Sequence, residues 1–163
     1  MGRPLPQPVP AVEDPALMLD VVAALLTQRI LARVTAGGCP GLRASDGFVF
    51  QHLVPGPMSV SHLAQRLQVT PQGASKLVLD LESRGYVRRT TDAGDQRRRL
   101  VELTTLGRRA VTRARAERST VAREFERVLG PEAGPAFVDA LRTLMEHLGG
   151  FDALRSRRLR PPS

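Results

Sequence analysis

Apolar residues recur at helical spacing along most of the chain, which predicts a mainly α-helical protein. The first segment with this spacing begins after Asp14-Pro15, where the aspartate suits an N-cap and the proline the first helical position. It ends at Gly37-Gly38. The positions at this spacing are Leu17, Val21, Ala24, Leu25, Gln28, Leu31 and Ala32. Because apolar residues cover more than one narrow stripe, we expect this helix to be buried on two sides.

Two short helices are predicted next. The first lies in the sequence LRASDGFVFQHLV and ends before Pro55-Gly56-Pro57. Its inward residues are Phe48, Val49 and Leu53. The second lies in MSVSHLAQRLQV, and either Ser59 or Ser61 suits its N-cap. Its inward residues are Val60, Leu63, Ala64 and Leu67.

A further helix follows after a tight connection, so the pair predicts a helix-turn-helix. Thr70 suits its N-cap, Pro71 its first position and Gly85 its left-handed stop. The inward residues are Ala74, Leu77, Val78 and Leu81. The outward residues are Gln72, Gly73, Ser75, Lys76 and Leu79.

The next segment predicts a β-hairpin. Residues 86–90 have strand character, residues 92–96 are turn-forming, and residues 98–104 alternate, with either Leu100 or the pair Val101 and Leu103 facing inward. A helix-turn-helix followed directly by a two-stranded hairpin is a winged helix. Two helices complete the chain, one from residue 105 to Gly130-Pro131 and one up to Gly149-Gly150.

Charge changes the picture by pointing to a partner. The 163 residues, enough for one domain, carry 24 basic and 16 acidic residues, a net charge of +8. The segment from Arg84 to Arg99 alone contains six basic and two acidic residues. A basic protein of this kind favours an anionic partner, nucleic acid before an anionic membrane surface.

Several function classes are disfavoured by the composition. The single cysteine, Cys39, excludes an internal disulfide and fits a reducing cytosol. His52, His62 and His147 have no metal-ligand spacing, no catalytic triad is suggested, and no cofactor motif occurs, so we expect no enzyme and no cofactor. No apolar run of the chain approaches 18 residues, and the proline-rich start has no signal-peptide core, which predicts a cytoplasmic protein without a membrane span.

Three sequence motifs together resemble the MarR family of bacterial winged-helix regulators. They are VSHLAQRLQVTPQGASKLVLDLESRGYVRR for the helix-turn-helix, DAGDQRRRLVELT for the wing, and LTTLGRRAV for the next helix. The wing pattern Asp-x-x-Asp-x-Arg at Asp92, Asp95 and Arg97, followed by Leu-Val-x-Leu-Thr and Leu-Gly-Arg, is the most specific of these signals.

The resemblance implies a mainly α fold with a small β-hairpin, in which terminal helices form a homodimer and winged lobes contact double-stranded DNA. It divides the chain into a disordered arm (1–13), a single domain (14–155) and a basic tail (156–163). Within the domain, residues 41–104 form the lobe, and residues 14–38 and 105–155 the dimerisation helices. The implied function is a repressor that binds a pseudo-palindromic operator and responds to a small, often aromatic, effector in a cleft between lobe and dimer helices.

The resemblance also implies DNA-contacting residues. In the helix that begins at Thr70 these are Thr70, Gln72, Gly73, Ser75 and Lys76. Glutamine pairs with adenine and lysine with guanine or phosphate, whereas Gly73 permits close backbone approach or leaves a base pair unread. In the wing, Arg97 is expected in the minor groove, with Arg98 and Arg99 beside it on phosphates. Asp95 is expected to stabilise the wing through Arg88 or Arg89 at its base.

Other interpretations stay open. A sequence-independent architectural DNA-binding protein would use the same charged surface, and a winged-helix protein-interaction module would turn the arginines toward an acidic partner. Cys39 follows the first helix, whereas the redox cysteines of some relatives lie near its start, so a small buried residue is the simpler interpretation. The arginines of the tail, Arg155, Arg157, Arg158 and Arg160, are expected in a disordered end.

Overall fold

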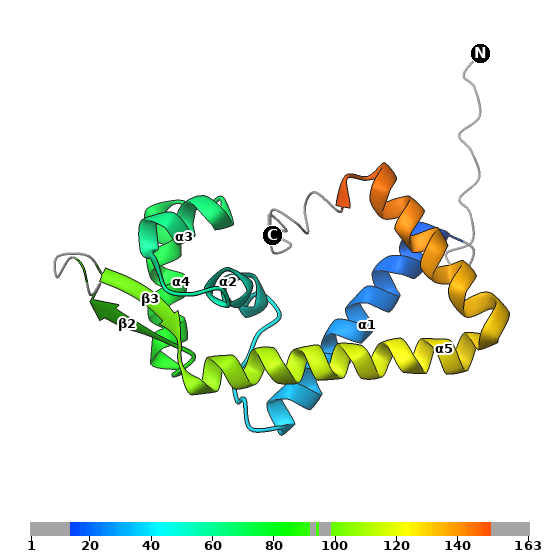
Figure 1. Cartoon of the computed structure of the whole chain (residues 1–163), viewed down its shortest axis with the longest axis horizontal. Helices are drawn as coiled ribbons and strands as arrows, with labels where there is room; N and C mark the ends of the chain where they lie inside the picture. Colours follow the sequence, from blue (N-terminus) through cyan, green and yellow to red (C-terminus); the bar gives the residue numbers. More distant parts are fainter. Residues whose placement is uncertain (1–13, 92–93, 95–98, 151–163) are drawn as a thin grey trace, which may run out of the picture.

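The computed structural model describes residues 14–91, 94 and 99–150, and it confirms a mainly helical protein with a small β-sheet. The predicted arm (1–13) and tail (156–163) lie outside the described residues. The elements, drawn in Figure 1, are α1 (Pro15–Ala36), α2 (Asp46–Leu53), β1 (Met58–Ser59), α3 (Val60–Leu67), α4 (Pro71–Ser83), β2 (Val87–Thr91), β3 (Arg99–Leu103) and α5 (Thr105–His147).

Helix α1 begins and ends as predicted. The Asp14 carboxylate accepts hydrogen bonds from the backbone N–H groups of Ala16 and Leu17, and the helix stops at Gly37. The expected burial on two sides is wrong for the single chain, because Val34 is the one residue of α1 that is fully buried. Its large exposed apolar residues are Leu17, Met18, Leu19, Val21, Val22 and Leu25.

The sequence has no unbroken apolar run of the length of a membrane span, but one helix in the described part of the chain is long and apolar enough by average composition. By length and composition alone α1 qualifies, since its 22 residues are mostly apolar and lie near the N-terminus. The charged residues Asp20 and Arg29 interrupt the apolar run, and this interruption hid the helix in a search for an unbroken apolar segment. Exposed apolar surfaces of this size mark sites of contact with a protein or a membrane.

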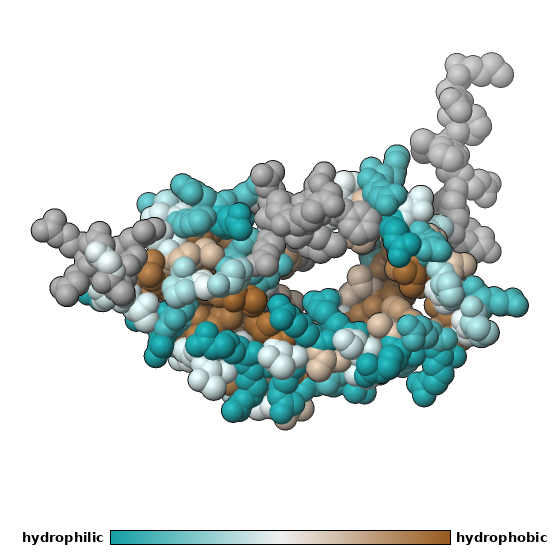
Figure 2. Space-filling model, in the orientation of Figure 1, coloured by the Kyte–Doolittle hydropathy of each residue, from teal (hydrophilic) through white to brown (hydrophobic). Residues whose placement is uncertain are grey.

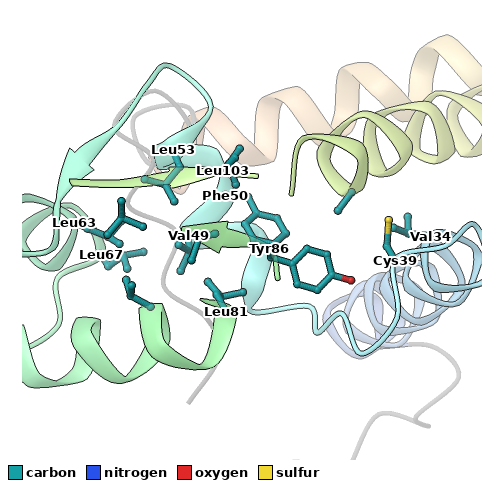
Figure 3. Close-up of a cluster of buried hydrophobic side chains, with 14 residues drawn as sticks. Val34, Cys39, Val49, Phe50, Leu53, Leu63, Leu67, Leu81, Tyr86 and Leu103 are labelled. Atoms are coloured by element: carbon teal, nitrogen blue, oxygen red, sulfur yellow. The ribbon is translucent and has the colours of Figure 1, made fainter. Parts of the chain in front are cut away.

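The hydrophobic core lies in the lobe formed by α2, α3, α4 and the sheet. Figure 3 shows Phe50 and Tyr86 side by side, with their ring centroids 5.6 Å apart, and the Tyr86 ring pointing toward Cys39 and Val34. Phe50 is buried, and Phe48, which was expected inward, is half-buried against the same core. Leu77 was also predicted inward but is 37% exposed, because it lies at the edge of the buried stripe of α4.

The sheet has three strands in the order β1-β3-β2, whereas the sequence predicts two. The additional strand is β1, in which Met58 pairs with Val101 and Ser59 with Leu100. Two residues carry no strand pattern of their own, so only their pairing with β3 defines the strand. Val101 and Leu103 of β3 are buried, which decides between the two predicted faces.

Helix α5 leads away from the lobe and bends sharply, as Figure 1 shows. It begins at the N-cap Thr104, and Gly130, with φ of 77°, interrupts it at the predicted Gly130-Pro131 position. After the bend the helix continues to His147 and exposes large apolar residues. These residues around and beyond the bend are Val128, Leu129, Val138 and Leu144, with Leu148 just past the helix.

The first part of α5 packs against the end of α1. An Arg29–Glu124 ion pair of 2.5 Å and an Arg33–Glu117 pair of 3.5 Å join the two helices. The residue number rises from Arg29 to Arg33 along α1, whereas the number of the partner falls from Glu124 to Glu117 along α5. The two helices therefore run in opposite directions at the contact. The chain therefore enters the lobe after the C-terminal end of α1 and leaves it at the N-terminal end of α5.

Candidate nucleic-acid interface

A three-residue turn joins α3 to α4. Helix α3 begins at Ser59, whose Oγ accepts a hydrogen bond from the His62 N–H at 3.2 Å. It ends at Gln68, whose φ of 57° and ψ of 41° place it in the left-handed region that non-glycine residues rarely adopt. This residue turns the chain so that Thr70 can start the next helix, which confirms the predicted helix-turn-helix.

The N-terminal end of α4 is capped and faces outward. The Thr70 Oγ1 accepts a hydrogen bond from the Gly73 N–H at 3.1 Å, and Pro71 occupies the first turn. Gln72 and Lys76, one helical turn apart, are both exposed, and Ser75 beside them is half-buried. The helix thus presents amide, ammonium and hydroxyl groups from a single face at its N-terminal end.

Gly73 is half-buried beneath the Thr70 cap. A Cβ added there would approach the Thr70 Oγ1 to 3.2 Å and the Val69 Cβ to 3.7 Å. The first contact is tight but involves a side chain that can shift, and the Gly73 φ is not left-handed. Backbone strain therefore does not require glycine at this position, and a side chain here would add to the outer face.

The described part of the wing is exposed and basic. Arg88 faces its cross-strand neighbour Glu102, with 2.6 Å between Nη2 and Oε1, and Arg89 lies 3.6 Å from Glu82. Arg99 is exposed and donates a hydrogen bond to the Thr91 hydroxyl at 3.2 Å. The partners described for Arg88 and Arg89 are glutamates; the partner predicted from the sequence, Asp95, lies outside the described residues, as do Arg97 and Arg98.

An arginine that the sequence analysis did not select joins α4 to the rest of the lobe. Arg84 donates to both carboxylate oxygens of Asp46, at 2.6 and 3.0 Å, and to the Gly41 carbonyl at 2.8 Å. It also pairs with Asp80 within α4, and its guanidinium lies 5.8 Å from the Tyr86 ring centroid. Hydrogen bonding to Asp46 is the main cause that raises the pKa of Arg84.

The sequence gives no signal for this pairing, because 38 residues separate Asp46 from Arg84 and Asp46 lies outside the quoted motifs. The Asp46 carboxylate also accepts a hydrogen bond from the Arg43 backbone N–H at 2.8 Å. This bond fixes the end of the loop that precedes α2. Together these bonds fix the C-terminal end of α4 against α2. They hold the helix that presents Gln72 and Lys76 at a set angle to the core.

The start of α5 is fixed to the base of the wing. The Thr104 hydroxyl donates toward the Gly85 carbonyl at 2.6 Å, and the Thr104 N–H donates to the Tyr86 carbonyl at 3.0 Å. A Cβ on the buried Gly107 would collide with the same Tyr86 carbonyl oxygen. This close approach explains the glycine of the Leu-Gly-Arg pattern in physical terms.

Other candidate groups lie away from this surface. Cys39 is fully buried, and the Tyr86 hydroxyl donates to the neighbouring Pro40 carbonyl at 2.8 Å. Burial is the main cause that raises the pKa of Tyr86. His52 is buried, whereas His62 and His147 are exposed on separate helices. Among the residues that the structure describes, no group of three or more histidine, cysteine or acidic residues could hold a metal ion.

Two recesses on the described surface lie away from the lobe, and no residue of the lobe lines either of them. One lies between α1 and α5, with a volume of about 390 Å³. The other, of about 380 Å³, lies at the bend of α5 around Gly130 and Pro135. The cleft expected between the lobe and the dimer helices is not one of these two.

The capped helix-turn-helix, the basic two-stranded wing and the long flanking helices define a winged-helix protein. Residues 48–98 match the model of the MarR family, and this segment spans α2 to the wing. The chain therefore resembles the MarR family over this segment, and its fold is shared with solved transcriptional regulators, among them one from Thermotoga maritima.

Solved structures share the fold over most of their length. RV1404 from Mycobacterium tuberculosis has a TM-score of 0.66 and 24% identity, covering 85% of this chain and 97% of that one. MepR from S. aureus in complex with DNA has a TM-score of 0.66 and 20% identity, with coverages of 80% and 95%. PcaV from Streptomyces coelicolor, in complex with its natural ligand, has a TM-score of 0.55 and 18% identity, with coverages of 85% and 96%. No curated protein matches the chain.

Proposed function

We propose that the protein is a homodimeric repressor that binds a pseudo-palindromic operator in double-stranded DNA and releases it when a small molecule binds. The single observation that carries the DNA-binding part is the outer face of α4. Its N-terminal end is capped and exposed, and it presents Gln72, Ser75 and Lys76 next to a basic wing. A helix of this kind fits the major groove, where such side chains reach base edges and phosphates.

The wing supplies a second contact. Arg97 is proposed to enter the minor groove, with Arg98 and Arg99 on phosphates; of these, Arg99 lies within the described residues and is exposed. Thr70 is proposed to contact the DNA backbone at the start of α4, where its hydroxyl already caps the helix. Gly73 allows the helix to approach the groove closely.

The homodimer is supported by apolar surface that one chain leaves uncovered. Figure 2 shows brown surface where α1 and the last part of α5 lie. Among the exposed apolar residues of these two segments, Leu25 is 60% exposed and Val138 is 50% exposed. Burying such residues against a second copy gains about 25 cal/mol per Å² of apolar surface. The apolar character of α1 is then explained by a subunit contact in the cytoplasm and not by a membrane span.

The operator and the response to a ligand follow from twofold symmetry. Two lobes related by a twofold axis predict two half-sites about one helical turn apart. A ligand that favours a different spacing of the lobes would weaken binding to that operator. MepR has been solved with DNA and with ethidium bromide, and PcaV with its natural ligand, which supports both kinds of partner for this fold.

A duplex-selection experiment tests DNA recognition. Duplexes selected from a random library by the wild-type protein should contain an inverted repeat and bind at least about 10³-fold more tightly than random duplex. Near-equal affinities would instead support a sequence-independent architectural protein, and a lack of duplex binding even at low salt would support a protein-interaction module. Gln72→Ala should relax the preference at one base pair of each half-site by about 1–3 kcal/mol.

Charge-matched variants separate groove contacts from general attraction. Lys76→Ala should weaken binding to every duplex and reduce the slope of log affinity against log salt by about 1 per subunit. Arg115→Ala, which removes one exposed positive charge from α5, is the control and should leave the slope nearly unchanged. Arg97→Ala should weaken binding with unchanged thermal stability, and unaltered affinity would exclude the proposed wing contact.

Sedimentation analysis tests the dimer. Leu25→Glu places a charge in the proposed interface and should convert the dimer to monomers at micromolar concentration. Val54→Glu changes another exposed apolar residue, located in the lobe, and should stay dimeric. A wild-type protein that sediments as a monomer would contradict the proposed interface.

A further inference from the structure

We propose that the recess between α1 and α5 binds a small organic anion that carries carboxylate or phosphate groups. This inference rests on the proposed function in one respect, since it identifies the chemical class of the effector. The recess has a volume of about 390 Å³, within the range of small-molecule pockets. Its lining residues are Arg29, Arg33, Thr120, Arg123, Glu124 and Arg127.

The positions of these residues follow from helix geometry. Arg29 and Arg33 are four residues apart on α1 and lie on one face. Thr120, Arg123 and Arg127 likewise lie on one face of α5 at spacings of three and four residues. The Arg29–Glu124 and Arg33–Glu117 ion pairs hold the two faces together, so the guanidinium groups converge on the space between them.

The recess has an excess of positive charge. Four arginines line it, and the acidic groups paired with them are Glu124 and Glu117. The described partner of Arg123 is the Thr120 hydroxyl at 3.1 Å, and Arg127 interacts electrostatically with Glu124, the carboxylate that also pairs with Arg29. Like-charged residues four apart on a helix repel each other, so the fold places the two arginine pairs face to face at an energetic cost.

Guanidinium groups recognise the oxygens of carboxylates and phosphates through paired N–H donors. Arg29 has five N–H groups and donates to Glu124, so most of its donors remain available. Thr120 holds Arg123 in place, which lowers the entropy that ligand binding would cost. The lining contains no aromatic residue, so the effector is recognised through its charge and not by ring stacking.

The location gives a bound anion influence over the lobe. Helix α1 leads through residues 37–45 into α2, and α5 begins directly after β3, so these two helices hold the lobe from both sides. An anion that contacts both helices would fix the angle at which they cross. That angle sets the position of α4 relative to a second copy in the dimer, and thereby the spacing of the two recognition helices.

Calorimetric titration of the full-length protein at constant ionic strength tests the site. The probes are citrate, inorganic phosphate and, as a charge-reversed control, benzylamine. Wild-type protein should bind citrate, phosphate or both saturably, with a dissociation constant of about 1 mM or tighter, and should not bind benzylamine. R123Q/R127Q should lose at least about tenfold in affinity for the bound anion.

R115Q/R118Q is the matched control, because it removes two exposed arginines from the same helix outside the recess. It should change affinity by less than about twofold. Equal losses in both double variants would mean general charge attraction, and absence of saturable binding would exclude the site; either result overturns the proposal. Loss of the dimer in R123Q/R127Q would assign these arginines to the subunit contact and would also overturn it.

A parallel measurement of duplex binding separates this proposal from the function it rests on. Addition of the bound anion at constant ionic strength should weaken binding to the selected duplex at least about tenfold, whereas R123Q/R127Q should resist this change. Saturable anion binding without any duplex binding would leave the site standing and contradict the regulator. Duplex binding that the bound anion does not alter would exclude its role as effector.

Discussion

Arg84 and Asp46 form a bidentate ion pair that joins the C-terminal end of α4 to the start of α2. The two guanidinium nitrogens lie 2.6 and 3.0 Å from the two carboxylate oxygens, and the Asp46 side chain is only 5% exposed. Because the same guanidinium donates to the Gly41 carbonyl, this one side chain fixes three segments. The proposed recognition helix is thus supported at the end opposite to its exposed face.

Removing this pair should destabilise the lobe. We expect Asp46→Ala to lower the free energy of unfolding by about 2–3 kcal/mol, below the largest values for buried pairs because Asp80 remains as a partner for Arg84. Arg84→Lys should also be destabilising, since an ammonium group cannot form the two parallel hydrogen bonds that the planar guanidinium makes with Asp46. Urea denaturation measures both. Arg43→Ala, which breaks only an exposed pair with Asp80, is the control and should cost less than about 1 kcal/mol.

Gly107→Ala should disrupt the start of α5. The added methyl group would collide with the Tyr86 carbonyl oxygen, which is backbone and also accepts the Thr104 N–H, so relief requires a shift of the helix. We expect a loss of about 2 kcal/mol or more. Gly47→Ala in α2 is the matched control, because nothing lies within 4 Å of its added Cβ, and it should be neutral or slightly stabilising. Equal effects of the two substitutions would contradict the close approach.

Gln68→Gly should stabilise the turn between α3 and α4. The left-handed conformation of Gln68 disfavours a side chain, and glycine adopts it without this cost. Glycine also gains entropy in the unfolded chain, so we expect a net gain of about 0.5 kcal/mol, measured by thermal or urea unfolding. Gln65→Gly, at an exposed position inside α3, should instead lose about 1 kcal/mol. A loss at both positions would show that the Gln68 backbone is not strained.

Thr70 is expected to have two separable roles. Thr70→Ala removes the acceptor for the Gly73 N–H and should lower the free energy of unfolding by about 1 kcal/mol. Thr70→Ser keeps the hydroxyl and should restore most of this stability. If Thr70 also contacts the DNA backbone as proposed, Thr70→Ser should restore duplex affinity as well. If duplex affinity is unchanged in both Thr70→Ala and Thr70→Ser, the role of Thr70 is limited to capping α4.

Locally encoded features of the lobe could be predicted from the sequence. The caps at Asp14 and Thr70 and the break at Gly130-Pro131 depend on a few neighbouring residues, and the structure places them as expected. The outer face of α4 followed from the same helical spacing. The wing arginines and Asp95 were selected by resemblance to a family, and their contacts with DNA stay predictions.

Errors arose where long-range contacts decide the outcome. Leu77 fits the apolar period of α4 but is 37% exposed, because period alone does not give the width of the buried stripe. The burial predicted for α1 is wrong for the single chain, in which its apolar residues are exposed. Asp20 and Arg29 interrupt the apolar run of α1, so its average composition, and not an unbroken run, makes it apolar enough for a span.

The sequence by itself determined the order of the helices, their caps, the helix-turn-helix and the two main strands, because each depends on interactions within a few residues. Only the tertiary structure decided the pairing of β1, the Arg84–Asp46 link across 38 residues and the Arg29–Glu124 contact across 95 residues. These contacts join segments whose separation along the chain leaves no periodic signal. They set the angle of α4 and create the arginine-lined recess, since geometry in space, and not local propensity, brings their side chains together.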